Sequence, residues 1–399
     1  MAKSIQYQTT GGLYSYSLDY DGTNWDLIYV SMVKSMTFES ATAALHNAPA
    51  GPAAIVLDAN PEVSSLFGTL DSEVDYSKAA TQSLPLFVGS SQVAAADILN
   101  TINRVIRARQ DANRGMSSGD VFYGDQKFWA KPFGSWADQD DHKGVSGYSA
   151  RTGGLALGAD AMLTDKSRVG MSFVFGNADV TGNSSIAPNS ADVDAYELIG
   201  YGNFALDPAS YLTYQLGLGM LRNDGQRDIP LAGLSAQSAY DSLVATAAIG
   251  ASRTYKLNEQ TNFTPSISAE YTWIKDDAYA ETGAGALNLE VDGRSVDGLV
   301  LAIEGELKHE ITKDTTFSTN LGVGYDVLQD QSSITAAFAG APGAIFTTEG
   351  LDQSPWLVRG GFGLASKTPG GMEVSARYDV EYREDFLNQT ASVNLRFGF

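Results

Sequence analysis

The chain has 399 residues, no cysteine, and 47 acidic against 26 lysine and arginine side chains, which gives a formal net charge of −21. The lack of cysteine excludes disulfides, thiolate metal sites and a cysteine nucleophile, and the acidic balance argues against nucleic acid as a partner. Because no run of 18 or more apolar residues occurs, strands would have to carry any membrane-spanning role.

The N-terminal region predicts β-strands followed by a connector. Residues 11–30 form two short alternating segments joined at Asp21-Gly22, a dipeptide typical of hairpin turns. Residues 41–87 are rich in alanine, proline and serine and show weak helical patterns. We therefore expect a β unit at 1–40 and a linker at 41–90. Residues 1–6 lack the apolar core of a signal peptide, so we expect the sequence to continue a longer precursor.

One helix is predicted within residues 91–114. Ile98, Ile102, Val105 and Ile106 recur at helical spacing, and Gly115 follows as a stop signal. This helix is a basic element in an acidic protein, and its central basic residues are Arg104, Arg107 and Arg109.

From Lys127 to the end, long segments alternate apolar with polar or small residues. Leu212, Leu216 and Met220 lie on one face of such a segment, whereas Thr213 and Gln215 lie on the other. Apolar faces of this length, with glycines opposite, indicate a barrel with lipid outside and a crowded, wet lumen. The predicted fold is an all-β transmembrane protein, a 12-stranded antiparallel outer-membrane β-barrel over 120–399. The predicted segments begin near Lys127, Arg151, Arg168, Ala191, Ser210, Ala239, Asn262, Val296, Thr315, Pro355, Met372 and Leu387.

The alternation also assigns faces and connections. Leu216, Phe173, Leu301 and Val374 are predicted to face lipid. Residues 164–166 and 207–208 are predicted periplasmic turns, and 138–147, 223–235 and 279–295 extracellular loops. The inward parity supplies acids to the lumen, namely Glu197, Glu270, Glu304, Glu306, Glu373 and Asp379.

Charge complementarity between these acids and the basic helix predicts that the helix lies in the pore. Unpaired charges would be costly in a narrow lumen. One observation keeps an alternative open. Arg359, Arg377 and Arg396 could satisfy some of the acids without any helix, which would then be solvated beneath the barrel.

The C-terminal segment is the most specific local signal. Apolar residues alternate with polar ones to a final aromatic residue, a pattern similar to the terminal strand that the barrel-assembly machinery recognises. The candidate assembly signal consists of Ala391, Val393, Leu395, Phe397 and Phe399.

These elements together resemble the autotransporters of type V secretion. The resemblance rests on Asn24-Trp25, the segment 128–134 (FWAKPFG), Ser354-Pro355-Trp356, Arg377-Tyr378 and the final Phe399. It implies a C-terminal translocator domain whose barrel is threaded by the helix 91–114, with residues 1–40 as the end of a β-helical, pertactin-like passenger. Some members cut the passenger at consecutive asparagines in the helix. Here Asn100 and Asn103 are separated, so that cleavage is not expected.

The implied role is insertion in the outer membrane of a Gram-negative bacterium and export of an N-terminal passenger. The implied partners are outer-membrane lipid, the barrel-assembly machinery, periplasmic chaperones and the chain's own passenger, with the barrel monomeric. No cofactor, metal or catalytic site is expected, because the histidines, His46, His142 and His309, fall in unrelated segments. The alternatives are a free-standing porin, a surface adhesin in which residues 1–90 bind a partner, and a soluble β-rich protein.

Overall fold

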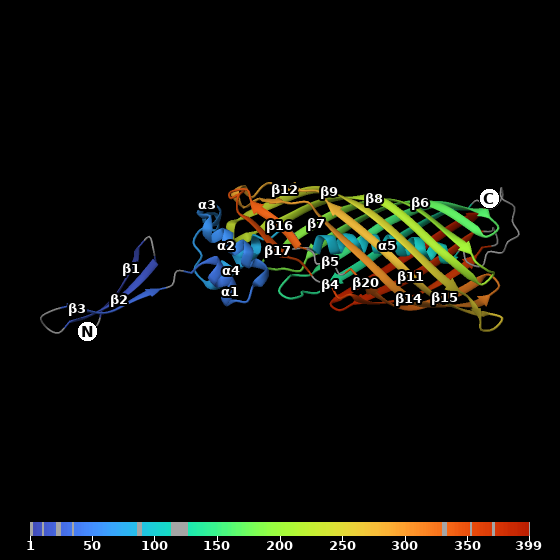
Figure 1. The fold of residues 1–399 in the computed structure, drawn as a ribbon, viewed down its shortest axis with the longest axis horizontal. Coiled ribbons are helices and arrows are strands. Elements are labelled where there is room, and N and C mark those ends of the chain that lie inside the picture. Colours follow the sequence, from blue (N-terminus) through green and yellow to red (C-terminus); the bar gives the residue numbers. More distant parts are fainter. Residues whose placement is uncertain are drawn as a thin grey trace.

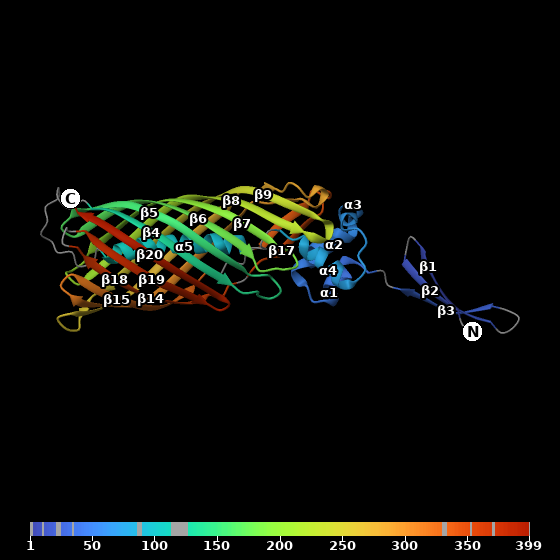
Figure 2. The ribbon, with the colours of Figure 1, turned by 180° about the vertical axis from the view of Figure 1, so that it is seen from behind.

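The computed structural model describes residues 3–9, 12–20, 25–33, 36–85, 90–112, 127–328, 333–351, 353–368 and 372–398. A tilted β-barrel dominates the molecule, with one helix running inside it (Figure 1). Short helices lie against one end of the barrel, and the C-terminus lies at the other end, as the view from behind also shows (Figure 2). Among the described helices, none is both long and apolar enough to span a membrane.

Twelve antiparallel strands close the barrel. β4 pairs with β20 and β9 pairs with β11, so the sheet has no free edge in its body. The two-residue strand β10 (Tyr255–Lys256) only extends one end of β11. The barrel strands are β4 (Lys127–Gln139), β5 (Tyr148–Thr164), β6 (Ser167–Gly182), β7 (Asn189–Ala205), β8 (Ser210–Ile229), β9 (Leu234–Arg253), β11 (Thr261–Asp276), β14 (Arg294–Thr312), β15 (Thr315–Asp326), β18 (Trp356–Lys367), β19 (Glu373–Arg383) and β20 (Phe386–Gly398).

The predicted number of barrel strands and their order are confirmed. β4, β8 and β15 begin at the predicted residues, and the largest displacement is in β9, which begins at Leu234 rather than Ala239. The outer face also follows the prediction. Leu216 is 69% exposed, and Phe173 and Leu301 are each 48% exposed, whereas Val374 is half-buried. Gln215 beside Leu216 is buried toward the lumen.

The loop predicted at 223–235 is wrong in most of its length. β8 continues to Ile229, and only a short turn, η4 (Pro230–Ala232) with Gly233, separates it from β9. The outward residues Arg222, Asp224 and Gln226 are polar because this part of the strand extends beyond the apolar band. Polar composition therefore resembled that of a loop, although the alternation persisted.

Residues 36–85 fold into a helical unit, which we call the cap. Thr37 begins its first helix with a capping box, and the Asp58 carboxylate accepts the backbone N–H groups of Phe38 and Glu39 at 2.8 and 2.9 Å. This segment lies mostly within the linker expected at 41–90 but begins in the part expected as a β unit, and it has its own buried side chains. Its elements are α1 (Phe38–Ala44), η1 (Ala48–Ala50), α2 (Gly51–Ala59), α3 (Pro61–Ser64), η2 (Ser65–Phe67) and α4 (Glu73–Gln82).

The long connections after β11 and β15 form a small sheet beside the cap (Figure 1). Its strands pair in the order β12, β13, β16 and β17, so two connections that are distant in sequence are joined. The elements are β12 (Tyr279–Ala280), η5 (Gly285–Leu287), β13 (Leu289–Val291), β16 (Ser333–Phe338) and β17 (Ile345–Glu349).

A separate three-stranded sheet precedes the cap. It consists of β1 (Lys3–Thr9), β2 (Gly12–Tyr20) and β3 (Trp25–Val33). β2 and β3 pair as the predicted hairpin, with Tyr20 opposite Trp25. All three strands pair antiparallel, as in consecutive hairpins. The neighbouring coils of a β-helix pair parallel instead.

Candidate functional site

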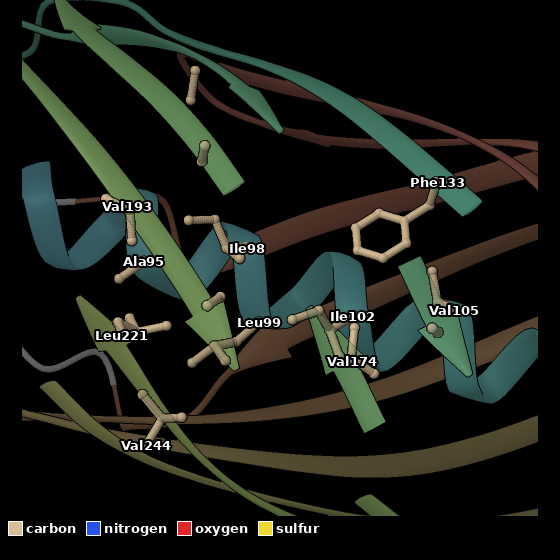
Figure 3. Close-up of a cluster of buried hydrophobic side chains, with 14 of the residues drawn as sticks. Ala95, Ile98, Leu99, Ile102, Val105, Phe133, Val174, Val193, Leu221 and Val244 are labelled. Carbon is tan, nitrogen blue, oxygen red and sulfur yellow. The ribbon is translucent and has the colours of Figure 1, made fainter. Parts of the chain in front are cut away.

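The candidate site is the lumen with its helix, α5 (Ser90–Ala112). The helix was predicted at 91–114, and residues 113–114 lie outside the described residues. Its direction follows from its neighbours. Ala95 and Ile98 lie beside Val193 and Leu221, toward the cap, and Val105 lies beside Phe133 farther down the lumen (Figure 3).

One face of α5 is apolar and packs on the barrel wall. Ile98, Leu99, Ile102, Val105 and Ile106 are each at most 2% exposed. The i, i+3, i+4 spacing gathers them on one stripe. They share a core with inward-facing side chains of eight barrel strands, among them Trp129, Phe133, Val174, Ile199, Tyr201, Leu221, Val244 and Ile274. Figure 3 shows part of this core. Each fully buried aliphatic side chain contributes about 1.5–3 kcal/mol, so this face fixes the helix against the wall.

The other face of α5 carries the predicted arginines toward lumenal acids. Arg107 forms ion pairs with Glu270 and with Glu304, the latter at 3.3 Å from Nη1 to Oε1. Arg104 Nη1 lies 3.6 Å from Glu381 Oε2. The predicted charge complementarity between helix and wall is therefore present for Arg107, while the partner of Arg104 is an acid outside the predicted set.

Arg359 from the barrel wall shares these acids. Its Nη1 lies 3.0 Å from both carboxylate oxygens of Glu270, and its Nε lies 2.9 Å from Glu381 Oε2. Arg383 Nε also lies 3.4 Å from Glu381 Oε1. A network of alternating charges results, in which the helix contributes only part of the positive charge. Such a network satisfies buried charges that would be costly alone.

A second cluster, around Asp160, holds the far end of α5. Asp160 accepts from Arg109 Nε at 2.8 Å, from Arg168 Nη1 at 2.9 Å and from the Tyr201 hydroxyl at 2.9 Å. Trp129 donates its indole N–H to the same hydroxyl at 2.7 Å. The side chains of Arg109 and Asp160 are fully buried, which makes this the most enclosed ion pair between helix and wall.

Neither Asp160 nor Glu381 was among the predicted lumenal acids. The signal was present in the alternation. Asp160 has the opposite parity to the outward Leu155 and Leu157, and Glu381 has the opposite parity to the outward Tyr382. Extending the alternation of inward and outward residues to the ends of these strands would have placed both acids in the lumen.

Three of the remaining predicted acids bond to side chains of the wall. Glu197 is 1% exposed and accepts from Thr246 Oγ1 at 2.6 Å. Glu306 lies 3.2 Å from Lys308 Nζ, and Asp379 lies 2.8 Å from Arg377 Nε. Glu373 lines a cavity at the end of the lumen opposite the cap. Of the predicted acids, Glu270 and Glu304 therefore form ion pairs with an arginine of α5.

Cavities remain on the polar side of α5. A cavity of about 50 Å³ lies among Arg107, Glu304 and Arg359, and a larger one of about 370 Å³ opens toward Lys313 and Lys367. Both are lined by Ala108, Glu306 and Arg377, so they adjoin. No group of three or more metal-binding side chains occurs in the part of the chain that the structure describes. The apolar wall on one side of α5 and the ion pairs on the other suit the lumen to holding a helix.

The candidate assembly signal forms the end of the closing strand β20. Val393 is 42% exposed on the outside, and Ala391 and Leu395 are half-buried. The backbone of Phe397 pairs with that of Phe128, at the seam between the last and first barrel strands. Phe399 lies outside the described residues, and the recognition role of this segment stays a prediction.

Known proteins share both sequence and fold with this chain. Residues 128–379 match the family model of the autotransporter beta-domain. Outer membrane protein A of Rickettsia conorii is 27% identical over 332 residues, which cover 78% of this chain and 16% of that protein. Esterase EstA of Pseudomonas aeruginosa is 27% identical over 140 residues, 35% of this chain and 21% of that protein.

Among solved structures, the translocator domain of autotransporter NalP from Neisseria meningitidis has a TM-score of 0.63 at 16% identity, covering 78% of this chain and 98% of that one. This likeness shows the barrel fold, and the family model covers most of the barrel sequence. The chain therefore belongs to the autotransporter β-domain family, whose barrels lie in the outer membrane of Gram-negative bacteria and export the passenger that precedes them in the chain.

Proposed function

We propose that this barrel brings to the cell surface a passenger that is attached before the cap. After export, α5 stays in the lumen as the last segment of the chain to have entered it. One observation carries the proposal. The chain passes from the cap, at one mouth of the barrel, through the lumen as α5 toward the opposite end, where the C-terminus lies (Figure 1). A polypeptide in this arrangement has its N-terminal part on the cap side of the membrane.

The free-standing porin is less well supported by the same observation. A porin needs an open, polar lumen, whereas α5 buries an apolar stripe and the Arg109–Asp160 pair in this one. The adhesin alternative assigns partner binding to residues 1–90. Half of that region is the cap, whose apolar side chains face the barrel's own loops. No catalytic role is proposed for the barrel.

The proposal includes two partners in assembly. Periplasmic chaperones would hold the unfolded chain, and the barrel-assembly machinery would bind the terminal segment that ends in Phe397 and Phe399. The exposed Val393 and the pairing of β20 with β4 support this role, since the last strand must be captured before the barrel closes. The closed sheet leaves no strand edge for a second copy, which favours a monomer.

Surface display tests the proposal directly. An epitope tag is placed ahead of Met1, behind an added export signal, and intact cells are treated with protease or with antibody. We expect the tag to be accessible. The matched control carries the tag in the turn between Asp165 and Lys166, which joins β5 to β6 at the end opposite the cap, and should be protected until the outer membrane is broken. Equal protection of both tags would contradict the proposal.

A further inference from the structure

The cap and the loops around the barrel mouth share one hydrophobic core. This core is distinct from the core around α5. Neither the cap nor the loops could bury these side chains alone, so docking is driven by removal of apolar surface from water. From the cap the core contains Phe38, Ala50, Ala53, Ala54, Val56, Leu57, Val63, Phe67, Ala79, Ala80 and Leu84, and from the barrel Ile229, Ala236, Ala284, Leu287, Leu289, Val291, Ile334, Ala336, Phe338, Ala341 and Phe346.

Buried hydrogen bonds and an ion pair also hold the cap to the barrel, at a joint around Arg227 and Gln82. Arg227 of β8 pairs with Glu281, with Nε 3.0 Å from Oε1, and donates to the backbone carbonyl of Gln82 at 2.6 Å, the last residue of α4. The Gln82 side chain donates to the carbonyl of Ile186 at 2.8 Å and accepts from the N–H of Leu231 at 3.0 Å. Undocking the cap would break these bonds of Gln82 and leave Arg227 only its contacts with Glu281 and Leu287, which weakens the joint between cap and barrel.

The cap reaches connections on several sides of the mouth. Gln82 contacts the β6–β7 and β8–β9 connections. A side chain added at Gly144, between β4 and β5, would come within 3.6 Å of Pro49. One added at Gly340, between β15 and β18, would come within 3.0 Å of Val63. The same side chain would come within 2.6 Å of Ala286, in the connection between β11 and β14, so glycine at 340 is required by two close approaches, of which α3 makes one. The cap thus lies across the opening.

The lumen itself is only partly filled. α5 packs on the wall that includes β4 to β9, and its other side borders the two adjoining cavities of about 50 and 370 Å³. Space for water therefore remains beside the helix in this part of the lumen. Closure at the surface then depends on what covers the mouth.

We propose that the cap is a seal that docks on the mouth at the end of export and closes the pore at the cell surface. The inference rests on the proposed function. Residues 36–85 lie between the passenger side of the chain and α5, so they must cross the barrel before they can reach the mouth from outside. The shared core can form only when they are outside. Docking therefore marks the completed transit of this segment, and the buried bonds of Arg227 and Gln82 oppose its return.

Cysteine labelling of intact cells tests whether the mouth is covered, because the chain has no native cysteine. Ala284→Cys places a thiol in the shared core, where residue 284 is 0% exposed, and Ala280→Cys places one at an exposed position of the same connection. With a membrane-impermeant maleimide, we expect residue 280 to react and residue 284 to react roughly tenfold or more slowly. Equal rates would overturn the seal. Failure of both to react would show that the loops are not at the surface, which overturns the proposed function as well.

Undocking variants test whether the cover closes the pore. Val63→Arg places a charge in the shared core, whereas Leu66→Arg changes a residue that is 38% exposed in η2, directly after α3. We expect Val63→Arg to abolish protection at residue 284 and to raise conductance of the full chain in planar bilayers several-fold, with Leu66→Arg like the parent. Leu57→Arg, at a second fully buried cap position of the same core, should act like Val63→Arg. Heat-modifiable migration verifies that each barrel has folded. Folded variants that are undocked yet conduct like the parent would overturn the seal.

Discussion

Removal of the Asp160 carboxylate is expected to destabilise the folded barrel more than removal of any exposed acid. Asp160 accepts from Arg109, Arg168 and Tyr201, and its side chain is fully buried. Asp160→Ala leaves two guanidinium groups facing each other in a closed space. Breaking a buried pair in this way costs about 3–5 kcal/mol, against at most about 1 kcal/mol for an exposed pair. We expect the free energy of unfolding to fall by the larger amount.

Urea unfolding of the barrel in lipid vesicles, followed by tryptophan fluorescence, measures this loss. Asp179→Ala is the matched control, because Asp179 is exposed on β6, and it should change stability by less than about 0.5 kcal/mol. Adding Arg109→Leu to Asp160→Ala should give a total loss about 1–3 kcal/mol smaller than the sum of the single losses, since the two groups interact. A loss below about 1 kcal/mol for Asp160→Ala, or additive losses, would refute the reasoning.

Three further predictions concern the wall, the seam and the helix. Leu216→Arg should lower the unfolding free energy in vesicles by about 2–4 kcal/mol, whereas Gln226→Arg, on the same strand beyond the apolar band, should change it little; similar losses would mean that the faces are misassigned. Deleting Phe399 should reduce the folded fraction in heat-modifiable migration of membrane fractions, and a normal yield would remove the assembly role. Arg107→Met should cost less in urea unfolding than Asp160→Ala, because Arg359 still neutralises the acids that Arg107 pairs with; an equal or larger cost would show that the wall arginine cannot compensate.

The barrel could be predicted because its signal is local and repeated. Each strand alternates between lipid and lumen, so Leu216 and Gln215 already separate the two faces in the sequence. The helix α5 was predictable for the same reason, through the spacing of Ile98, Ile102 and Ile106. Element boundaries were less secure where a strand leaves the membrane, as at the end of β8, because the polar outward residues there resemble those of a loop.

The cap could not be predicted, because its structure depends on distant segments. Its helices are short, and isolated helices of this length are marginal in water. They are stabilised by side chains such as Phe338 and Phe346, more than 250 positions away from α2. The partners of the charged side chains could not be predicted for a similar reason. Parity placed Glu197 and Glu270 in the lumen, but only the three-dimensional position of α5 decided that Arg107 meets Glu270 and not Glu197.

The most direct test of the account is whether residues 90–112 occupy the lumen. Two truncated chains, one beginning at Ser90 and one at residue 113, both lack the cap and differ only in α5. Their single-channel conductance is compared in planar bilayers after heat-modifiable migration has shown that both barrels are folded. The account predicts a severalfold larger and steadier conductance for the chain without α5. Equal conductance of the two chains would contradict the placement of the helix in the pore.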